Sequence, residues 1–282
     1  MALRPNPRPE VISTLKHPAI VRARQALGQI GHIHATHYLL EGHRRAHQAL
    51  ESPAPVEAVF VRAPGTAAED LALIGAVAAR GIPCHLVSRG IFVRIHDLGY
   101  ETSVTALTLV RRQFATQLPL PVAERDCILV GERIQDPKNV GSLIRTADAW
   151  AVAGVILTQD SADPFSRGSV RASTGSILRV PLSLAAHPAE CLQKLRQHGV
   201  LIIGTSARGS PTCWDANLSG PCAFVMGNES VGLTQQTRAL CDSVVRIPMM
   251  GGAHSFNVAV AAGILLYEHM RQKNAAGTLP QP

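Results

Sequence analysis

Short apolar runs alternate with longer helix-like stretches through residues 126–274. The apolar runs lack the polar alternation of a half-exposed strand, so each predicts a strand buried on both faces. Strands that alternate with helices form a parallel sheet, so we predict an α/β domain. The expected strands are residues 127–130, 154–157, 201–204, 222–226 and 244–247, and the expected helices are residues 139–149, 189–198 and 257–273.

The preceding part of the chain predicts a smaller α/β domain. Its expected helices are residues 18–30, 36–50 and 67–80, and its expected strands are residues 58–61 and 83–87. A stretch with two prolines follows and is typical of a linker. The predicted division is a disordered tail at 1–10, the small domain at 11–112, the linker at 113–125, the larger domain at 126–274 and a second disordered tail at 275–282.

Turn-forming and polar residues concentrate where two predicted strands end. Residues 227–233 (Gly-Asn-Glu-Ser-Val-Gly-Leu) follow one strand, and the other is stopped by Pro248 before a pair of glycines at 251 and 252. Glycine lets a ligand approach the backbone closely, so both turns suit the adenine or ribose of a ligand. An ordinary strand-to-helix turn is the alternative for either segment alone.

A third polar segment opens the helix predicted at residues 139–149. Asn139 is a suitable N-cap, which would place Arg145 in the second turn, near the positive end of the helix dipole. Anions bind in such positions, and a guanidinium can hold a phosphate through two hydrogen bonds. A solvated surface arginine is the alternative for Arg145 considered alone.

Together, the three segments resemble the three motifs of the SpoU, or TrmH-like, branch of the SPOUT superfamily of RNA methyltransferases. The resemblance extends from about residue 126 to residue 273. Phe256 departs from the family pattern, which usually has leucine there. The first motif comprises Asn139, Gly141 and Arg145, the second Gly227, Glu229, Gly232 and Leu233, and the third Ile247, Pro248, Met249, Ser255, Asn257 and Val258.

The resemblance implies a C-terminal trefoil knot, a homodimer and transfer of a methyl group from S-adenosylmethionine to a ribose 2′-hydroxyl of RNA. A guanidinium stays protonated and is a poor base, so we expect Arg145 to orient the nucleotide and stabilise alkoxide charge. Glu229 is expected to pair with an arginine, either in the same chain or across the dimer. Helix capping is the structural alternative for Ser255 and Asn257. The implied catalytic residues are Arg145, Asn139, Glu229, Ser255 and Asn257, and the implied cofactor-binding residues are Gly227, Ile247, Met249 and Phe256.

The charge of the chain favours a polyanionic partner. Lys and Arg total 27 against 20 acidic residues, which gives a net charge of +7. Residues 1–50 contain seven basic and two acidic residues, which predicts a surface that follows a phosphate backbone, with a solvated basic tail as the alternative. Residues 39–42 (Leu-Leu-Glu-Gly) resemble the family's accessory RNA substrate-binding domain. The candidate RNA-binding residues are Arg22, Arg24, Arg44, Arg45 and Arg171.

Other features argue against a metal site or a membrane protein. The six cysteines form no CxxC pair and are typical of reduced thiols in a cytoplasmic protein. His43 and His47 share a helical face, but no further ligand completes a metal site. The chain has no predicted signal peptide or membrane-spanning run.

The substrate is left open between ribosomal RNA, transfer RNA and an antibiotic-resistance target, with ribosomal RNA favoured because related proteins with an accessory domain commonly act there. Two other functions stay open. One is a non-catalytic RNA-binding protein of the same fold, which the complete set of motif residues disfavours. The other is a methyltransferase that modifies a base nitrogen, for which a carboxylate base is expected in the pocket.

Overall fold

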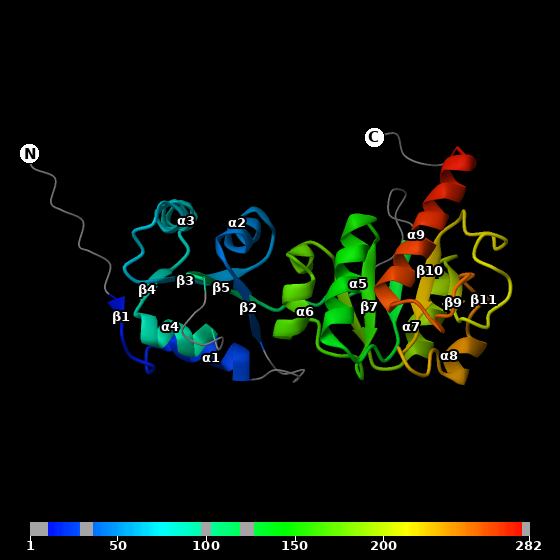
Figure 1. Cartoon of the computed structure of the whole chain (residues 1–282), viewed down its shortest axis with the longest axis horizontal. Coiled ribbons are helices and arrows are strands. Elements are labelled where there is room, and N and C mark those ends of the chain that lie inside the picture. The colour runs from blue at the N-terminus through cyan, green and yellow to red at the C-terminus, as the bar shows by residue number, and fades with distance from the viewer. Residues whose placement is uncertain (1–10, 29–35, 97–102, 119–126, 278–282) are drawn as a thin grey trace, which may run out of the picture. The chain divides into compact units, whose positions relative to one another are not determined.

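The computed structural model describes residues 11–28, 36–96, 103–118 and 127–277, and the chain forms two compact units, residues 1–112 and 113–282 (Figure 1). The predicted tails at residues 1–10 and 278–282, and residues 119–126 of the predicted linker, lie outside the described residues. Residues 113–118 of the predicted linker belong to the second unit, where Ala115 N donates to Leu182 O and Phe114 contacts Phe165 edge to face.

The first unit is a mixed sheet with helices on both faces (Figure 1). The strand order is β1-β4-β3-β5-β2, in which β5 runs antiparallel to β3 and β2. The strands are β1 (Val11–Ile12), β2 (His37–Glu41), β3 (Val56–Arg62), β4 (Cys84–Val87) and β5 (Ala106–Arg111). The helices are α1 (Pro18–Gly28), α2 (His43–Glu51), α3 (Ala68–Ala79) and α4 (Arg89–His96).

Successive residues of β3 divide the core of this unit in two. Ala58 and Phe60 pack with α1 and α4, whereas Val59 and Val61 pack with α2 and α3. This alternation follows from the two-residue period of a strand. Helices α1 and α4 therefore cover one face of the sheet, and α2 and α3 cover the other (Figure 1).

The helix predicted at residues 36–50 is wrong in its first part. Residues 37–41 form β2, which pairs with β5, and α2 begins only at His43. Gly42 separates the two elements with a φ of 88°, a conformation that glycine adopts without steric cost. Strand β5 was not predicted either.

The second unit is a parallel six-stranded sheet in the order β11-β9-β10-β6-β7-β8, which confirms the predicted parallel α/β domain. The strands are β6 (Cys127–Gly131), β7 (Gly154–Thr158), β8 (Leu182–Ala185), β9 (Leu201–Thr205), β10 (Cys222–Met226) and β11 (Ser243–Val245). The helices are α5 (Pro137–Ala149), α6 (Arg167–Ala172), α7 (Pro188–Gln197), α8 (Gln235–Ala239) and α9 (Val258–Ala275), with a 3₁₀ turn at Ser176–Leu178.

Helices cover both faces of this sheet. Ala223 and Val225 of β10 pack in the core that α7 covers, while Phe224 points to the other face and contacts His269 of α9. Strand β8 and the short helices α6 and α8, of four to six residues each, were not predicted. The trefoil knot stays a prediction. None of the described helices is long and apolar enough to cross a membrane.

Candidate active site at the carboxyl edge of the parallel sheet

The loops that carry the three motif segments meet at one edge of the second sheet. All its strands are parallel, so their carboxyl ends share this edge, where ligands of open α/β sheets bind. The chain leaves β11 at the end of the sheet and reaches Asn257 beside α5, which follows β6. Residues 246–257 therefore connect the carboxyl end of β11 with the beginning of α5.

A chain of side-chain hydrogen bonds joins one residue from each motif. Asn139 Nδ2 donates to Glu229 Oε1 at 2.8 Å. Asn257 Nδ2 donates to Asn139 Oδ1 at 2.7 Å. Asn257 also caps α9, because its Oδ1 accepts from Ala259 N at 2.9 Å. The structure thus brings together three of the predicted catalytic residues, and it also bears out the capping role considered for Asn257.

The carboxylate of Glu229, in the loop at residues 227–233, contacts the beginning of α5. This carboxylate accepts hydrogen bonds from Asn139 and from the backbone N–H groups of Gln135 and Asp136. Pairing of Glu229 with an arginine across a dimer stays a prediction. Partial burial disfavours the charged form, but hydrogen bonds from the Asn139 side chain and from backbone N–H groups outweigh it and lower the pKa of Glu229. Glu229 is therefore ionised and engaged as an acceptor at neutral pH.

Helix α5 begins earlier than predicted, which moves Arg145 along it. Asp136 is the N-cap, with its side chain accepting from Lys138 N at 2.8 Å, and Pro137 occupies the first helical position. Asn139 is therefore inside the first turn, and Arg145 lies in the third turn instead of the second. Arg145 is exposed, and it points about 120° away from Asn139 around the helix axis.

Two motif glycines lie where the backbone is crowded. A Cβ atom on Gly227 would lie 2.4 Å from the backbone of Gly232 and Leu233. A Cβ atom on Gly141 would lie 2.2 Å from the carbonyl oxygen of Ser169, so α5 and α6 pack closely there. Both glycines thus have a steric role, whatever they contribute to ligand binding.

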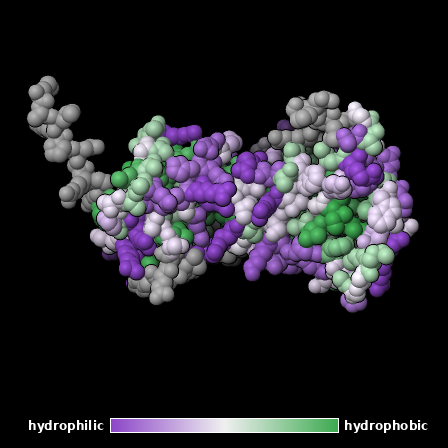
Figure 2. Space-filling view, turned by 45° about the horizontal axis from the view of Figure 1, so that its top comes forward, coloured by the Kyte–Doolittle hydropathy of each residue, from purple (hydrophilic) through white to green (hydrophobic). Residues whose placement is uncertain are grey.

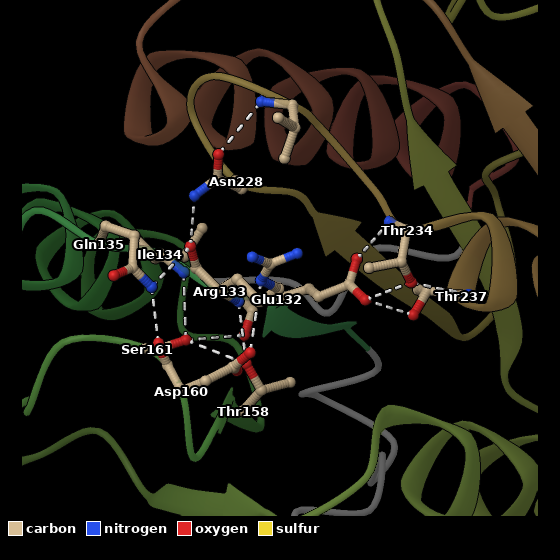
Figure 3. Close-up of polar contacts among 12 residues, drawn as sticks. Glu132, Arg133, Ile134, Gln135, Thr158, Asp160, Ser161, Asn228, Thr234 and Thr237 are labelled. Atoms are coloured by element: carbon tan, nitrogen blue, oxygen red, sulfur yellow. Dashed lines mark hydrogen bonds and ion pairs between the residues drawn. The ribbon is translucent and has the colours of Figure 1, made fainter.

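The loop between β6 and α5 is held by its neighbours on the same edge (Figure 3). Arg133 N donates to Thr158 Oγ1, and Arg133 O accepts from Asn228 Nδ2. Ile134 N donates to Ser161 Oγ at 3.1 Å. Arg133 has a φ of 56°, which is uncommon for a residue other than glycine. These contacts hold the start of α5, and with it Asn139, against the motif loop at residues 227–233.

The sequence analysis missed Glu132, the residue before Arg133. Its carboxylate is buried and accepts hydrogen bonds from Thr234 and Thr237, which follow the loop at residues 227–233 (Figure 3). An acidic residue directly after a fully apolar strand was the available signal, because buried carboxylates require polar partners.

The predicted cofactor-binding residues lie along the same edge. Ile247 and Met249 are partly buried in the segment after β11, and the Phe256 ring is 40% exposed. Ser255 is exposed, two residues before Asn257. In the described part of the chain, no group of three or more metal-ligating side chains comes together.

The structure does not bring the predicted RNA-binding arginines of the first unit together. Arg22 and Arg24 are on α1, and Arg44 and Arg45 are on α2, which covers the opposite face of the sheet. Arg22 Nε lies 2.6 Å from Glu57 Oε1, and Arg45 donates to Gln48. In the second unit, Arg171 is exposed on α6, which packs against α5.

The chain matches proteins of one family along both units. Residues 126–267 match the model of the SpoU rRNA Methylase family. The 23S rRNA (guanosine-2′-O-)-methyltransferase RlmB of Escherichia coli strain K12 is 30% identical over 245 residues, 86% of this chain and 97% of that protein. The enzyme of the same name from Vibrio parahaemolyticus is 37% identical over 153 residues, 54% of this chain and 62% of that enzyme's length.

A solved structure agrees with this match. The SpoU methyltransferase AviRb from Streptomyces viridochromogenes, in complex with the cofactor AdoMet, superimposes with a TM-score of 0.78 at 27% identity. The superposition covers 90% of this chain and 99% of AviRb. The three motif segments, their arrangement at the carboxyl edge and these matches lead to one assignment: the chain belongs to the SpoU rRNA methylase family.

Proposed function

We propose that this chain transfers the methyl group of S-adenosylmethionine to the ribose 2′-hydroxyl of a guanosine in 23S ribosomal RNA. Membership of the family makes it an S-adenosylmethionine-dependent RNA 2′-O-methyltransferase. The RNA and the nucleotide are inferred from the curated relatives, which are named as 23S rRNA (guanosine-2′-O-)-methyltransferases. The observation that carries the proposal is the hydrogen-bond chain Glu229–Asn139–Asn257, which unites all three motif segments at the edge where a ligand would bind.

S-adenosylmethionine supplies an electrophilic sulfonium methyl group, so the protein has to align the attacking hydroxyl and stabilise its developing charge. Arg145 is exposed and permanently charged, which suits a clamp on the nucleotide phosphate and the alkoxide. Asn139 and Asn257 hold the surrounding loops, and Ser255 lies on the same segment as Asn257. The main chain at Gly227 and Ile247, with Met249 and Phe256, would hold the adenosine.

The state of Glu229 favours ribose over base methylation. Removal of a proton from a base nitrogen calls for a carboxylate free to accept it. Glu229 has a lowered pKa and already accepts three hydrogen bonds, which makes it a weak proton acceptor. Its contribution is therefore to hold Asn139 and the start of α5.

The first unit would act as the accessory domain that binds the RNA substrate, joined by the linker to the methyltransferase domain at residues 126–274. Arg24 and Arg44 are exposed on helices of opposite faces, so RNA that contacts both has to follow the edge of this unit. Arg171 offers a further cation beside α5. A cytoplasmic location is part of the proposal, since ribosomal RNA is modified there.

A homodimer is also part of the proposal. The face of the second unit seen in Figure 2 includes a hydrophobic patch among hydrophilic side chains. On α9, Val260 is 50% and Tyr267 is 58% exposed, and the Tyr267 ring contacts Trp150 at the end of α5. Exposed apolar groups on packed helices suit burial against a second copy of this surface.

The deciding experiment is transfer of labelled methyl from S-adenosylmethionine into total RNA from cells that lack this protein. The RNA is separated by size and digested to nucleosides. We expect label in 2′-O-methylguanosine from 23S RNA. Label in a modified base would overturn the proposed chemistry, and label in transfer RNA would overturn the substrate. Absence of label, with RNA binding retained, would support a non-catalytic RNA-binding protein.

A further inference from the structure

Glu132 is a buried carboxylate at the end of the central strand β6. Its side chain is 2% exposed. Oε2 accepts from the backbone N–H of Thr234 at 2.9 Å, and Oε1 accepts from the hydroxyls of Thr234 and Thr237 at 2.7 and 2.6 Å (Figure 3). All three donors are neutral and come from residues more than 100 positions along the chain.

A buried carboxylate of this kind requires its hydrogen-bond donors to keep their positions. A buried charge is tolerated only when hydrogen bonds replace its hydration, so displacement of Thr234 or Thr237 would expose the full cost of desolvation. Thr234 is itself the N-cap of α8, with its hydroxyl accepting from Thr237 N. Glu132 thus fixes the first turn of α8 to the end of β6.

The same residue also holds the other end of the motif loop. Glu132 N donates to Met226 O at 2.8 Å, and Met226 is the last residue of β10, immediately before Gly227. The main chain of Glu132 therefore holds the start of the loop at residues 227–233, and its side chain holds the end. Between these two points lie Gly227 and Glu229, whose carboxylate holds Asn139.

We propose that Glu132 is a positioning residue for the methyl transfer. It fixes the distance between the two ends of the loop at residues 227–233. Through that loop it positions the backbone that binds adenosine and maintains the Glu229–Asn139 contact. This inference rests on the proposed function, because the loop is taken to bind S-adenosylmethionine. Loosening either threonine contact should weaken cofactor binding in the folded enzyme without removing any group that touches the substrate.

Thr237 provides the sharpest test, because two substitutions distinguish the effect of its hydroxyl group from the effect of its side-chain shape. Thr237→Val keeps the shape and removes the donor, whereas Thr237→Ser keeps the donor. Binding of S-adenosylmethionine to the full chain is measured by calorimetry, together with kcat and KM for the cofactor. We expect Thr237→Val and Glu132→Gln to raise the Kd about tenfold, as loss of a hydrogen bond to a buried charge implies. Thr237→Ser should bind nearly as the wild type does.

Val152→Ala is the control for a general loss of stability. Val152 is buried just before β7, at the amino edge of the sheet and away from the site. Its substitution should lower Tm and leave the cofactor Kd unchanged. If Thr237→Val and Glu132→Gln lower Tm but also leave Kd and kcat/KM unchanged, Glu132 is only structural and the inference fails. Failure of the wild-type protein to bind S-adenosylmethionine would instead overturn the proposed function.

Discussion

Asn257 donates a 2.7 Å hydrogen bond to the side-chain oxygen of Asn139, although 118 residues separate them in the chain. The partners determine both amide orientations. The Glu229 carboxylate accepts only, so Asn139 has to present its amide nitrogen there and its oxygen to Asn257. Asn257 Oδ1 accepts a hydrogen bond from Ala259 N at the start of α9, which leaves the amide nitrogen of Asn257 to donate. The site is therefore a directed chain of contacts.

Asn257→Asp separates the catalytic role of this residue from its capping role. Aspartate caps helices as well as asparagine does, but it cannot donate to Asn139. We expect Tm to stay close to that of the wild type and kcat to fall about tenfold or more, as loss of a positioned hydrogen bond implies. Asn257→Ala removes the cap as well, so its Tm should fall too. Full activity of the Asn257→Asp variant would show that the contact with Asn139 is dispensable.

The lowered pKa of Glu229 predicts a pH-dependent contribution to stability. The unfolded chain titrates near the ordinary value of 4.5, and the folded chain titrates lower. Ionised Glu229 therefore contributes stability above the unfolded value, and this contribution is lost as pH falls through the folded pKa. Thermal unfolding of wild type and Glu229→Gln between about pH 3 and 7 should show a Tm difference that narrows below the ordinary value. A constant difference would contradict this.

Substitution of Arg145 should reduce turnover without affecting the cofactor. Arg145 is exposed in the third turn of α5 and takes no part in the Glu229–Asn139–Asn257 chain. We expect Arg145→Ala to lower kcat about a hundredfold or more, since it removes charge stabilisation in the transition state. Arg145→Lys keeps the charge but cannot make the paired hydrogen bonds of a guanidinium, so it should recover only part of the rate. If Arg145→Ala no longer binds S-adenosylmethionine in calorimetry, the role assigned to Arg145 in the transition state is wrong.

Gly227→Ala should abolish cofactor binding and lower stability. Its added methyl group would lie 2.4 Å from the main chain of Gly232 and Leu233, so the loop has to open. Gly220→Ala is the matched control, because no atom lies within 4 Å of its added Cβ and the residue precedes β10 at the opposite edge of the sheet. Equal Kd and Tm values in the two variants would contradict the steric role of Gly227.

The arginines of the first unit should differ in their share of RNA binding. Arg22 is paired with Glu57, whereas Arg44 is exposed at the start of α2. We expect Arg44→Gln to weaken RNA binding and to reduce the slope of log K against log salt by about 0.7 to 0.9, the value for one phosphate contact. Arg22→Gln should change the slope less. Identical slopes in wild type and Arg44→Gln would place the RNA elsewhere.

The sequence by itself determined the parallel sheet and the motif residues. The runs that form β6, β7 and β10 are buried along their whole length and β9 is buried at its centre, so each is a short, mainly apolar run bounded by turn-forming residues. The glycines and polar residues that end these strands mark loops for the same local reason, and a resemblance in three spaced motifs needs no coordinates.

The tertiary structure decided everything that depends on residues distant in the chain. Residues 37–41, which the sequence predicted as helix, form a strand because they pair with β5. Arg24 and Arg44 are separated because their helices pack on opposite faces of the sheet. The partners of Glu229 and Glu132 lie about 90 to 105 positions away, beyond any local pattern. A hydrogen bond forms only where folding brings donor and acceptor within about 3 Å, so such contacts follow from the topology of the sheet and not from spacing along the chain.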